Sequence, residues 1–496
     1  MKKVAPYAVA LSTLLATACG VSHGESFGYV TNSPLSTVNA ATPTGYYEHA
    51  QQLDARVYPG LFIRDTHNQF VPNTDMGTAV ASKDSSGNTS IYYTLSATYS
   101  DGQPLTCVDF LASYKLGYQP MYSHVRSLEC TGLQNNFRVV MDPGYQWQAL
   151  FGPGTIMPAH VLADAVGIDI DNLVLTLNED TSAGSTGQWP RDPETGELVS
   201  EVDMLATLRQ QWSSLFSLNN FSRENFPSYG PYTITAVDSM GDGRRITLEA
   251  NPNYRGAAPA QSPLEVYSRG ALPENNKDIF AADFDGTLSW LDRDKSNGDY
   301  AVTAAAGTMI ESLVFDGQGL FADVNNRKAL AACVDRDAVA AVSSEKSGVT
   351  VPAVTTRLIQ QSTDSSSDSA LPSPPSFSTQ NLGEVRMGYY GDPERMEAMI
   401  ESMKQSCAPS GTTIEIDNSN PDVILAAVDP ATHFGYDISN PYSLRLAESQ
   451  LWDSVLTIPL AAQPRLFAAQ RGLCNFSTNT SASGLGWNMD RWQEDT

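Results

Sequence analysis

Alternating apolar and polar residues predict several β-strands along this chain. The runs 232–237 and 245–250 both alternate in this way, and the segment 238–243 between them is rich in the aspartate and glycine that tight turns favour. Together they predict an antiparallel hairpin. Shorter β-prone runs at 90–96 and 137–141, separated by Gly, Asp and Asn, predict a β-rich unit between about residues 60 and 145.

Apolar residues at helical spacing predict the main helices. One helix begins after Thr106, which is a suitable N-cap, and another covers 205–215. The apolar residues of 323–343 fall roughly on one face, so we predict a single helix there. Arg327 and Arg336 would lie on this helix and form surface salt bridges.

The last third of the chain combines a loop with a mixed strand and helix pattern. Residues 361–380 are rich in Ser and Pro and predict a surface loop. A strand at 385–390, a helix at 393–406 and a strand at 413–416 predict a β-α-β unit, and 422–427 predicts a further buried strand.

The N-terminus predicts a lipid anchor. Lys2 and Lys3 precede an apolar stretch, 4–18, that is too short to span a bilayer and is typical of a signal peptide. Its end, LATAC at 15–19, resembles a bacterial lipobox, so we predict cleavage before Cys19 and lipid attachment there. Residues 19–45 would form the lipidated tether, and the protein would lie on the extracytoplasmic face of the cell membrane. The alternative is a plain secretory signal cut at the same small residues.

Length, composition and charge indicate the class of protein and exclude one class of partner. The chain has 496 residues, 41% of them apolar and 17% charged, which is typical of a soluble protein with two large lobes or about three compact units. Its 55 acidic and 30 basic residues give a net charge of -25. Such a surface repels phosphate backbones and anionic headgroups, so we expect no nucleic-acid partner.

The cysteines predict disulfides in an oxidising compartment. Cys107 and Cys130 close a short local loop and are our first pair. Cys333 with Cys407 is the second pair, and Cys407 with Cys474 is the alternative, because spacing alone does not decide connectivity. No C-x-x-C occurs and the histidines are scattered, so we predict no metal and no cofactor.

Seven separated segments carry a family resemblance. The first, YSDGQPLTCVDF at 99–110, is similar to the signature F-S-D-G-x-P-[LV]-T-A-x-D-[FV]. The others are PAHV (158–161), GPY (230–232), ITLEANPNYRG (246–256), NRKALAACVDR (326–336), IPL (458–460) and WNM (487–489). In this order they resemble the extracytoplasmic solute-binding proteins of family 5, the peptide and nickel type that serves ABC importers.

The resemblance implies an α/β fold of the two-lobed periplasmic-binding-protein type, in its large three-subdomain variety. Two lobes joined by crossing strands would close on a ligand by a hinge motion. On this basis we place the first lobe at 46–265 and 445–496 and the second at 266–444. The protein would be a monomer that delivers its ligand to the permease of an ABC transporter.

The resemblance also implies an oligopeptide ligand. Peptide-binding members pair the ligand's ammonium with an aspartate in a segment like W-x-A-D-Y-x-[DE]-P, and here the corresponding segment is LAAVDPATHF at 425–434. The family's aspartate falls on Ala426, so Asp429 is the nearest substitute and Asp437 a weaker one. Thr37 and Asn39 would lie near the peptide backbone. A structural alternative is that Asp429 caps the turn before Pro430.

Two other functions stay open at this stage. The segments VYPGLF (57–62), PNTD (72–75) and LFGPG (150–154) resemble actinobacterial lipoproteins, one of which acts in the synthesis of envelope glycolipids rather than in import. In addition, IFAADFDGTL at 279–288 resembles the first motif of haloacid-dehalogenase phosphatases, in which Asp283 would attack phosphorus and Asp285 would act as acid and base beside Mg²⁺. The motif lies far from a domain start, so we predict a protein without catalytic activity.

Overall fold

A ten-stranded mixed sheet runs through the whole molecule. The computed structural model describes residues 27–178, 201–272, 278–286, 299–358, 374–436 and 441–494. In the order in which they lie side by side, the strands are β14 (Thr413–Ile416), β13 (Glu384–Tyr389), β15 (Val423–Val428), β12 (Tyr300–Val314), β16 (Thr457–Gln470), β11 (Ile279–Phe284), β1 (Phe27–Thr31), β10 (Leu264–Tyr267), β9 (Gly243–Ala250) and β8 (Tyr232–Met240).

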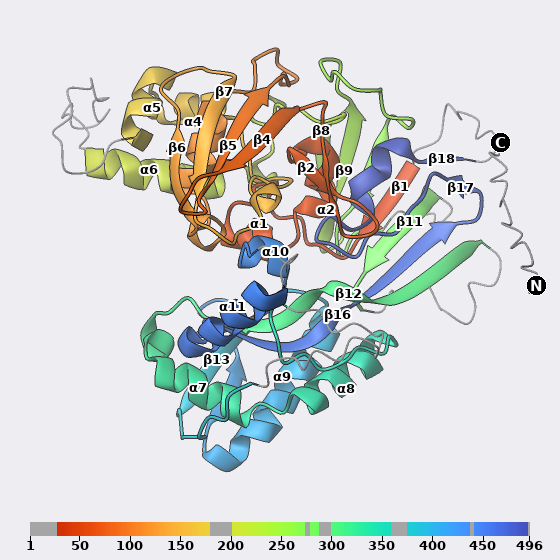
Figure 1. Ribbon diagram of the computed structural model, residues 1–496. Helices are drawn as coiled ribbons and strands as arrows, with labels where there is room; N and C mark the ends of the chain where they lie inside the picture. The colour runs from red at the N-terminus through yellow and green to blue at the C-terminus, as the bar shows by residue number, and fades with distance from the viewer. Residues whose placement is uncertain are drawn as a thin grey trace, which may run out of the picture.

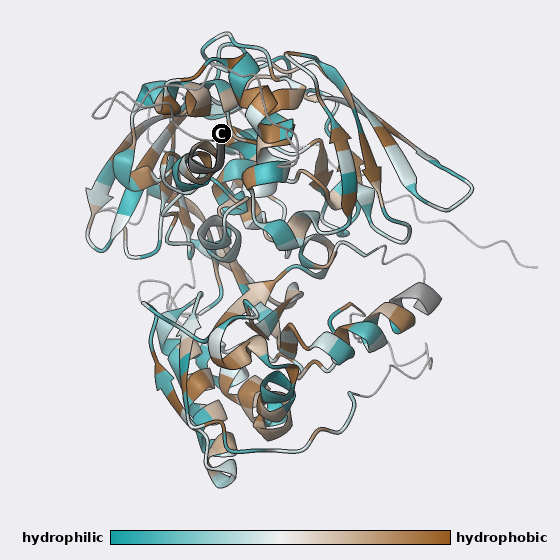
Figure 2. Ribbon diagram, turned by 90° about the vertical axis from the view of Figure 1, so that its left-hand side faces the viewer, coloured by the Kyte–Doolittle hydropathy of each residue, from teal (hydrophilic) through white to brown (hydrophobic). Residues whose placement is uncertain are grey.

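Two long antiparallel strands connect two lobes. β12 has 15 residues and β16 has 14, and they pair along most of their length. Figure 1 shows them crossing from the upper body, here called the first lobe, to the lower body, the second lobe. In the orthogonal view of Figure 2 the ribbon again narrows to a waist between the two bodies. The predicted two-lobed α/β fold is therefore confirmed.

The second lobe contains the predicted β-α-β unit. β13 and β14 are parallel, and α9 (Pro393–Cys407) connects them. Asp392 caps α9 by accepting the backbone N–H of Arg395 at 3.0 Å, and Pro393 occupies the first helical position, where its missing N–H costs nothing. Methionines on the inner face of α9 pack in the core of this lobe, which also contains Leu313 and Trp452.

The helix predicted over 323–343 is two helices, α7 (Val324–Cys333) and α8 (Arg336–Ser347). Val334 is extended, and Asp335 starts the second helix by accepting the N–H of Ala338 at 3.0 Å. The surface salt bridges predicted for the two arginines are also wrong. Arg327 donates to main-chain carbonyls, including that of Ser454, and Arg336 donates to the carbonyl of Pro459.

The first lobe carries the β-rich unit. Its small antiparallel sheet has the order β4 (Gly77–Lys83), β5 (Thr89–Leu95), β7 (Asn136–Met141) and β6 (Val125–Glu129). The predicted helix after Thr106 is α3 (Cys107–Leu116), and Thr106 with Asp109 forms a capping box at its start. The predicted hairpin is β8 and β9, which pair antiparallel.

The remaining elements are shorter. A hairpin of β2 (Phe62–Arg64) and β3 (Phe70–Pro72) and the helices α1 (Pro43–Tyr47) and α2 (Gln51–Val57) lie near the waist. The others are α4 (Ala159–Val166), α5 (Ile170–Asn178), α6 (Glu201–Ser214), α10 (Pro430–His433), α11 (Pro441–Ser454), β17 (Leu473–Cys474), β18 (Gln493–Glu494) and the 3₁₀ segment η8 (Gly484–Arg491).

The predicted tether at 19–45 extends too far. β1 is a fully buried strand between β10 and β11, with both of which it pairs in parallel. A run of five residues carries little strand signal by itself. Its partner strands lie more than two hundred residues away in sequence, so the neighbouring sequence does not indicate the pairing either. The proposed lobe boundaries also shift, since Trp452, Val455 and Ile458 pack in the core of the second lobe.

Both predicted disulfides are formed. Cys107, at the start of α3, is bonded to Cys130, which directly follows β6. Cys333 at the end of α7 is bonded to Cys407 at the end of α9, so the alternative pairing of Cys407 with Cys474 is wrong. Among the described helices, none has the length and apolar character needed to cross a bilayer.

Candidate functional site

A cavity lies where the two lobes meet. Most of its wall comes from the first lobe, while Asp429 and Thr432 of the second lobe close it. Phe62, Phe70 and Met121 form apolar parts of the wall. A mainly apolar wall with a few polar and charged side chains is typical of a small-molecule site.

Asp429 is held at the edge of the second lobe by the fold of its own segment. β15 is an almost entirely buried apolar strand, and it ends at Val428. Asp429 then accepts the backbone N–H of Ala431 at 3.0 Å and caps α10, whose first residue is Pro430. The structural alternative of a capping role is therefore confirmed. The capped carboxylate also faces the first lobe and lines the cavity.

Arg64 meets Asp429 from the first lobe. It ends β2, and the turn that follows is fixed by Asp65, whose Oδ1 accepts the N–H groups of His67 at 2.9 Å and Gln69 at 2.8 Å. The guanidinium lies 4.9 Å from the ring centroid of Phe70 and forms an ion pair with Asp429. Only 9% and 5% of the two side chains are exposed, so a buried ion pair joins the lobes.

Aromatic rings also bring the two lobes into contact. His433 of α10 lies 5.7 Å from Tyr46, and Tyr47 stacks on Tyr390 at 5.5 Å. Tyr145 of the first lobe stacks on Tyr436 at 4.9 Å. Burial lowers the pKa of His433 to about 4, although the charge of Asp429 acts in the opposite direction. The ring contacts between the lobes show that the lobes are closed on each other in this structure.

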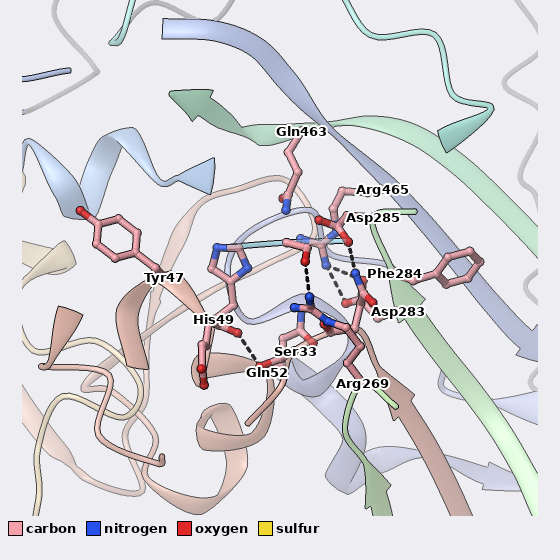
Figure 3. A pocket seen from close by; sticks show the side chains of 13 residues that line it. Ser33, Tyr47, His49, Gln52, Arg269, Asp283, Phe284, Asp285, Gln463 and Arg465 are labelled. Carbon is pink, nitrogen blue, oxygen red and sulfur yellow. Dashed lines mark hydrogen bonds and ion pairs between the residues drawn. The ribbon is translucent and has the colours of Figure 1, made fainter. Parts of the chain in front are cut away.

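A second cavity lies at the crossover of the strands. Figure 3 shows charged side chains converging in it, among them Asp283, Asp285 and Arg465. Arg465 of β16 donates to both carboxylate oxygens of Asp283 at 2.6 Å. Burial raises the pKa of Asp283 despite Arg465. Burial disfavours the charge of Asp285 as well, but Arg395 and Arg269 outweigh it and its pKa is lowered.

Comparisons with known proteins agree with this architecture. The family model for bacterial extracellular solute-binding proteins, family 5 (middle region), matches residues 77–422, which is more than half of the chain. This chain belongs to family 5 of the bacterial extracellular solute-binding proteins.

Relatives of this family 5 protein include a lipoprotein of Mycobacterium tuberculosis. It is 28% identical, and the alignment covers 98% of this chain and 95% of the relative. Among solved structures, the oligopeptide-binding protein of Thermus thermophilus in complex with a pentapeptide has a TM-score of 0.63 at 13% identity, covering 95% and 96% of the two chains. The A. tumefaciens R10 protein AgaA in complex with agropinic acid has a TM-score of 0.61 at 12% identity, covering 95% and 98%.

The other residues predicted for ligand binding in this family 5 protein are used inside the fold. Thr37 donates through its hydroxyl to the carbonyl of Phe216 at 2.9 Å, and Asn39 donates to the carbonyl of Trp212 at 2.8 Å. Both side chains are buried. Because both side chains already donate to main-chain carbonyls inside the fold, we expect neither of them to bind the ligand directly. Cys19 and Asp437 lie outside the described residues.

The resemblance to a phosphatase motif has no support in this geometry. A nucleophilic aspartate needs an open site for its phosphate ester. Asp283 is instead buried against Arg465 and accepts the backbone N–H of Leu485 at 2.9 Å, and Asp285 pairs with Arg395 at 2.7 Å. Among the residues that the structure describes, no group of three or more His, Cys, Asp or Glu side chains is placed to hold a metal ion.

Sequence reasoning missed Arg64 and the segment 481–483, which also lines the cavity. Both lie far from Asp429 in sequence; Arg64 is separated from it by 365 positions. The one signal for Arg64 is local: a basic residue ends a short apolar run immediately before the polar turn 65–69.

Proposed function

We propose that this protein captures a peptide-type solute between its lobes and delivers it to an ABC importer. The meeting of Arg64 and Asp429, one from each lobe, in the cavity between the lobes carries this proposal. Closure of the lobes creates a site that neither lobe has alone, so binding and closure are coupled. The solute is thereby removed from water before delivery.

Asp429 is the group that would pair with the ammonium of the ligand. An ammonium buried in a closed cleft without a carboxylate partner would cost several kcal/mol, at an order of magnitude. Asp429 is buried, faces the cavity and keeps one oxygen on its helix cap, so its other oxygen is available once Arg64 moves. The bound pentapeptide in the Thermus protein supports a ligand of this class.

The same proposal places the protein on the extracytoplasmic face of the cell membrane, as a monomer anchored through a lipid on Cys19. Supporting this are the LATAC segment at 15–19 and the lipoprotein names of the mycobacterial relatives. The importer's permease would be its protein partner.

The test is a screen of the delipidated protein against pooled peptides by thermal shift and calorimetry. A ligand that binds only the folded state stabilises it by about 2.7 kcal/mol at a hundredfold excess over Kd. A shift with at least one pool is the expected result. If none of the peptide pools produces a shift, peptide capture is rejected.

The second candidate function is regulation of envelope glycolipid synthesis without transport. Two observations favour this function over peptide capture. Asp429 already has a partner in Arg64, and Ala426 stands where peptide-binding members have their aspartate. A shift with an envelope glycolipid, or a membrane enzyme that copurifies, would support this function in the absence of any peptide response.

We also propose that the protein has no catalytic activity. The ion pairs of Asp283 and Asp285 leave neither carboxylate open to a phosphate ester. Mg²⁺-dependent hydrolysis of a panel of phosphate esters should be absent. Hydrolysis that Asp283→Asn abolishes would overturn this conclusion.

A further inference from the structure

A short main-chain contact joins the two lobes away from the strands that cross between them. Tyr145, in the turn after β7, forms an antiparallel β-bridge with Tyr436 of the second lobe. Beside it, the N–H of Gln146 donates to the carbonyl of Gly435 at 2.6 Å. In Figure 1, α10, which ends two positions before Gly435, reaches the first lobe to the left of β12 and β16. The lobes therefore share a backbone hydrogen bond in addition to the strands that connect them.

Three stacked rings run across this bridge from one lobe to the other. The ring centroids of His124 and Tyr145, both in the first lobe, are 4.5 Å apart. The ring of Tyr145 in turn stacks on that of Tyr436, with centroids 4.9 Å apart. Stacked rings attract each other beyond the effect of burial alone. The stack therefore stabilises the same arrangement of the lobes as the hydrogen bond.

Gly435 allows the second lobe to approach this closely. Its φ is +68°, in the left-handed region that favours glycine. A Cβ at this position would lie only 2.5 Å from Cε1 of the His124 ring. The histidine directly precedes β6, is 3% exposed, and accepts the N–H of Asp142 at its carbonyl at 3.0 Å. The bare backbone of Gly435 thus fits against a ring that the first lobe holds in place.

We propose that His124, Tyr145 and Gln146 of the first lobe and Gly435 and Tyr436 of the second form a clasp that holds the lobes closed in the absence of a ligand. The hydrogen bond and the ring stack are made by the chain alone, so closure does not depend on contacts that a ligand supplies. A solute then enters or leaves only when the clasp opens, and exchange is slowed in both directions. This consequence rests on the proposed function, whereas the clasp itself does not.

The experiment compares the ligand-free, delipidated full-length protein with its Gly435→Ala variant at pH 7. Small-angle scattering gives the radius of gyration, and hydrogen exchange with mass spectrometry follows the amide of Gln146. The variant should be larger and should exchange this amide at least about tenfold faster, because the added Cβ cannot approach His124 and the hydrogen bond between the lobes is lost. Unchanged dimensions and exchange would overturn the proposal.

Two further variants separate loss of the clasp from strain in the backbone. Gly317 of the second lobe has a similar φ of +74°, but a Cβ there would meet nothing within 4 Å. Gly317→Ala should therefore leave both measurements unchanged. Adding His124→Ala to Gly435→Ala should restore part of the protection, because the smaller side chain leaves room for the new Cβ. An equal effect of Gly317→Ala, or no recovery in the double variant, would contradict the clasp.

The outcomes also separate the clasp from the proposed function. If Gly435→Ala opens the lobes but no peptide pool shifts the thermal transition, the clasp stands and peptide capture is wrong. If peptides bind but Gly435→Ala changes neither the dimensions nor the exchange, the clasp is wrong and peptide capture stands.

Discussion

Arg395 of α9 and Asp285, which directly follows β11, form a buried ion pair at 2.7 Å across 110 positions of sequence. The same guanidinium pairs with Glu311 of the crossing strand β12. One cation therefore serves two carboxylates at the waist of the molecule. Burial raises the pKa of Glu311 to about 7 although Arg395 opposes it, so the charge balance of the waist depends on this arginine.

Replacement of Arg395 by methionine should destabilise the protein by roughly 3–5 kcal/mol. The substitution keeps most of the volume but leaves Asp285 and Glu311 without their cation in a buried place. Urea denaturation followed by tyrosine and tryptophan fluorescence measures this loss.

The matched control for this prediction is Arg386→Met. Arg386 pairs with Asp422 at 2.7 Å with 35% of its side chain exposed, so its loss should cost less than about 1 kcal/mol. Equal losses in the two variants would contradict the assignment of the waist cluster as a stabilising centre.

Local pattern predicted the elements of this fold where a single signal decides the structure. The hairpin of β8 and β9 and the β-α-β unit around α9 carry period-two or helical spacing together with turn or cap residues. The break at Val334 was missed because apolar spacing continues across it. A cap residue, Asp335, outweighs that spacing by starting a new helix.

The site depended on information that a single sequence does not display. Asp429 was found through its position beside Pro430 and a family pattern, whereas Arg64 was not. Their contact exists only because the fold brings a hairpin of the first lobe against the end of β15. The buried positions of Thr37 and Asn39 likewise follow from packing against α6 and the segment after it.

Removal of either disulfide should lower the free energy of unfolding by roughly 3–5 kcal/mol in the chain-entropy model. The cysteines are separated by 23 positions in Cys107–Cys130 and by 74 in Cys333–Cys407, so the loss should be larger for the second pair. Cys-to-Ser double variants of each pair, compared by chemical denaturation, measure the difference.

The pairing itself is checked by alkylation under denaturing, non-reducing conditions. Cys107, Cys130, Cys333 and Cys407 should all resist the reagent until a reductant is added. Free reaction of both members of a pair would contradict that disulfide.

Cys19→Ala should release the protein to the medium or leave it unprocessed. The predicted anchor depends on the thiol of this residue, because lipid attachment precedes cleavage in the pathway that a lipobox serves. Fractionation and mass spectrometry of the N-terminus distinguish the outcomes. A variant that stays in the membrane as a processed, acylated species would show that the anchor lies elsewhere.

Acidification should open the lobes, because histidines buried at their contact, among them His124 and His433, are uncharged when the lobes are closed. His124 of the first lobe stacks on Tyr145 at 4.5 Å and packs against Gly435 of the second, and His433 packs against Tyr46. Burial lowers the pKa of each from 6.5 to about 4. Between these values an open or unfolded state binds protons that the closed state does not, so the stability of the closed state falls as the pH falls. Its loss approaches roughly 2–3 kcal/mol per histidine at pH 4.

Small-angle scattering of the unliganded protein from pH 7 to pH 4.5 measures this opening as an increase in the radius of gyration. His433→Gln, which stays neutral, should shift the transition to lower pH, whereas replacement of the exposed His67 by Gln should leave it unchanged. Since Asp429 acts to raise the pKa of His433, Asp429→Asn should lower that pKa further and delay protonation of the closed state. Dimensions that stay constant down to pH 4.5, or an opening that occurs as the pH is raised, would show that these histidines do not control the contact between the lobes.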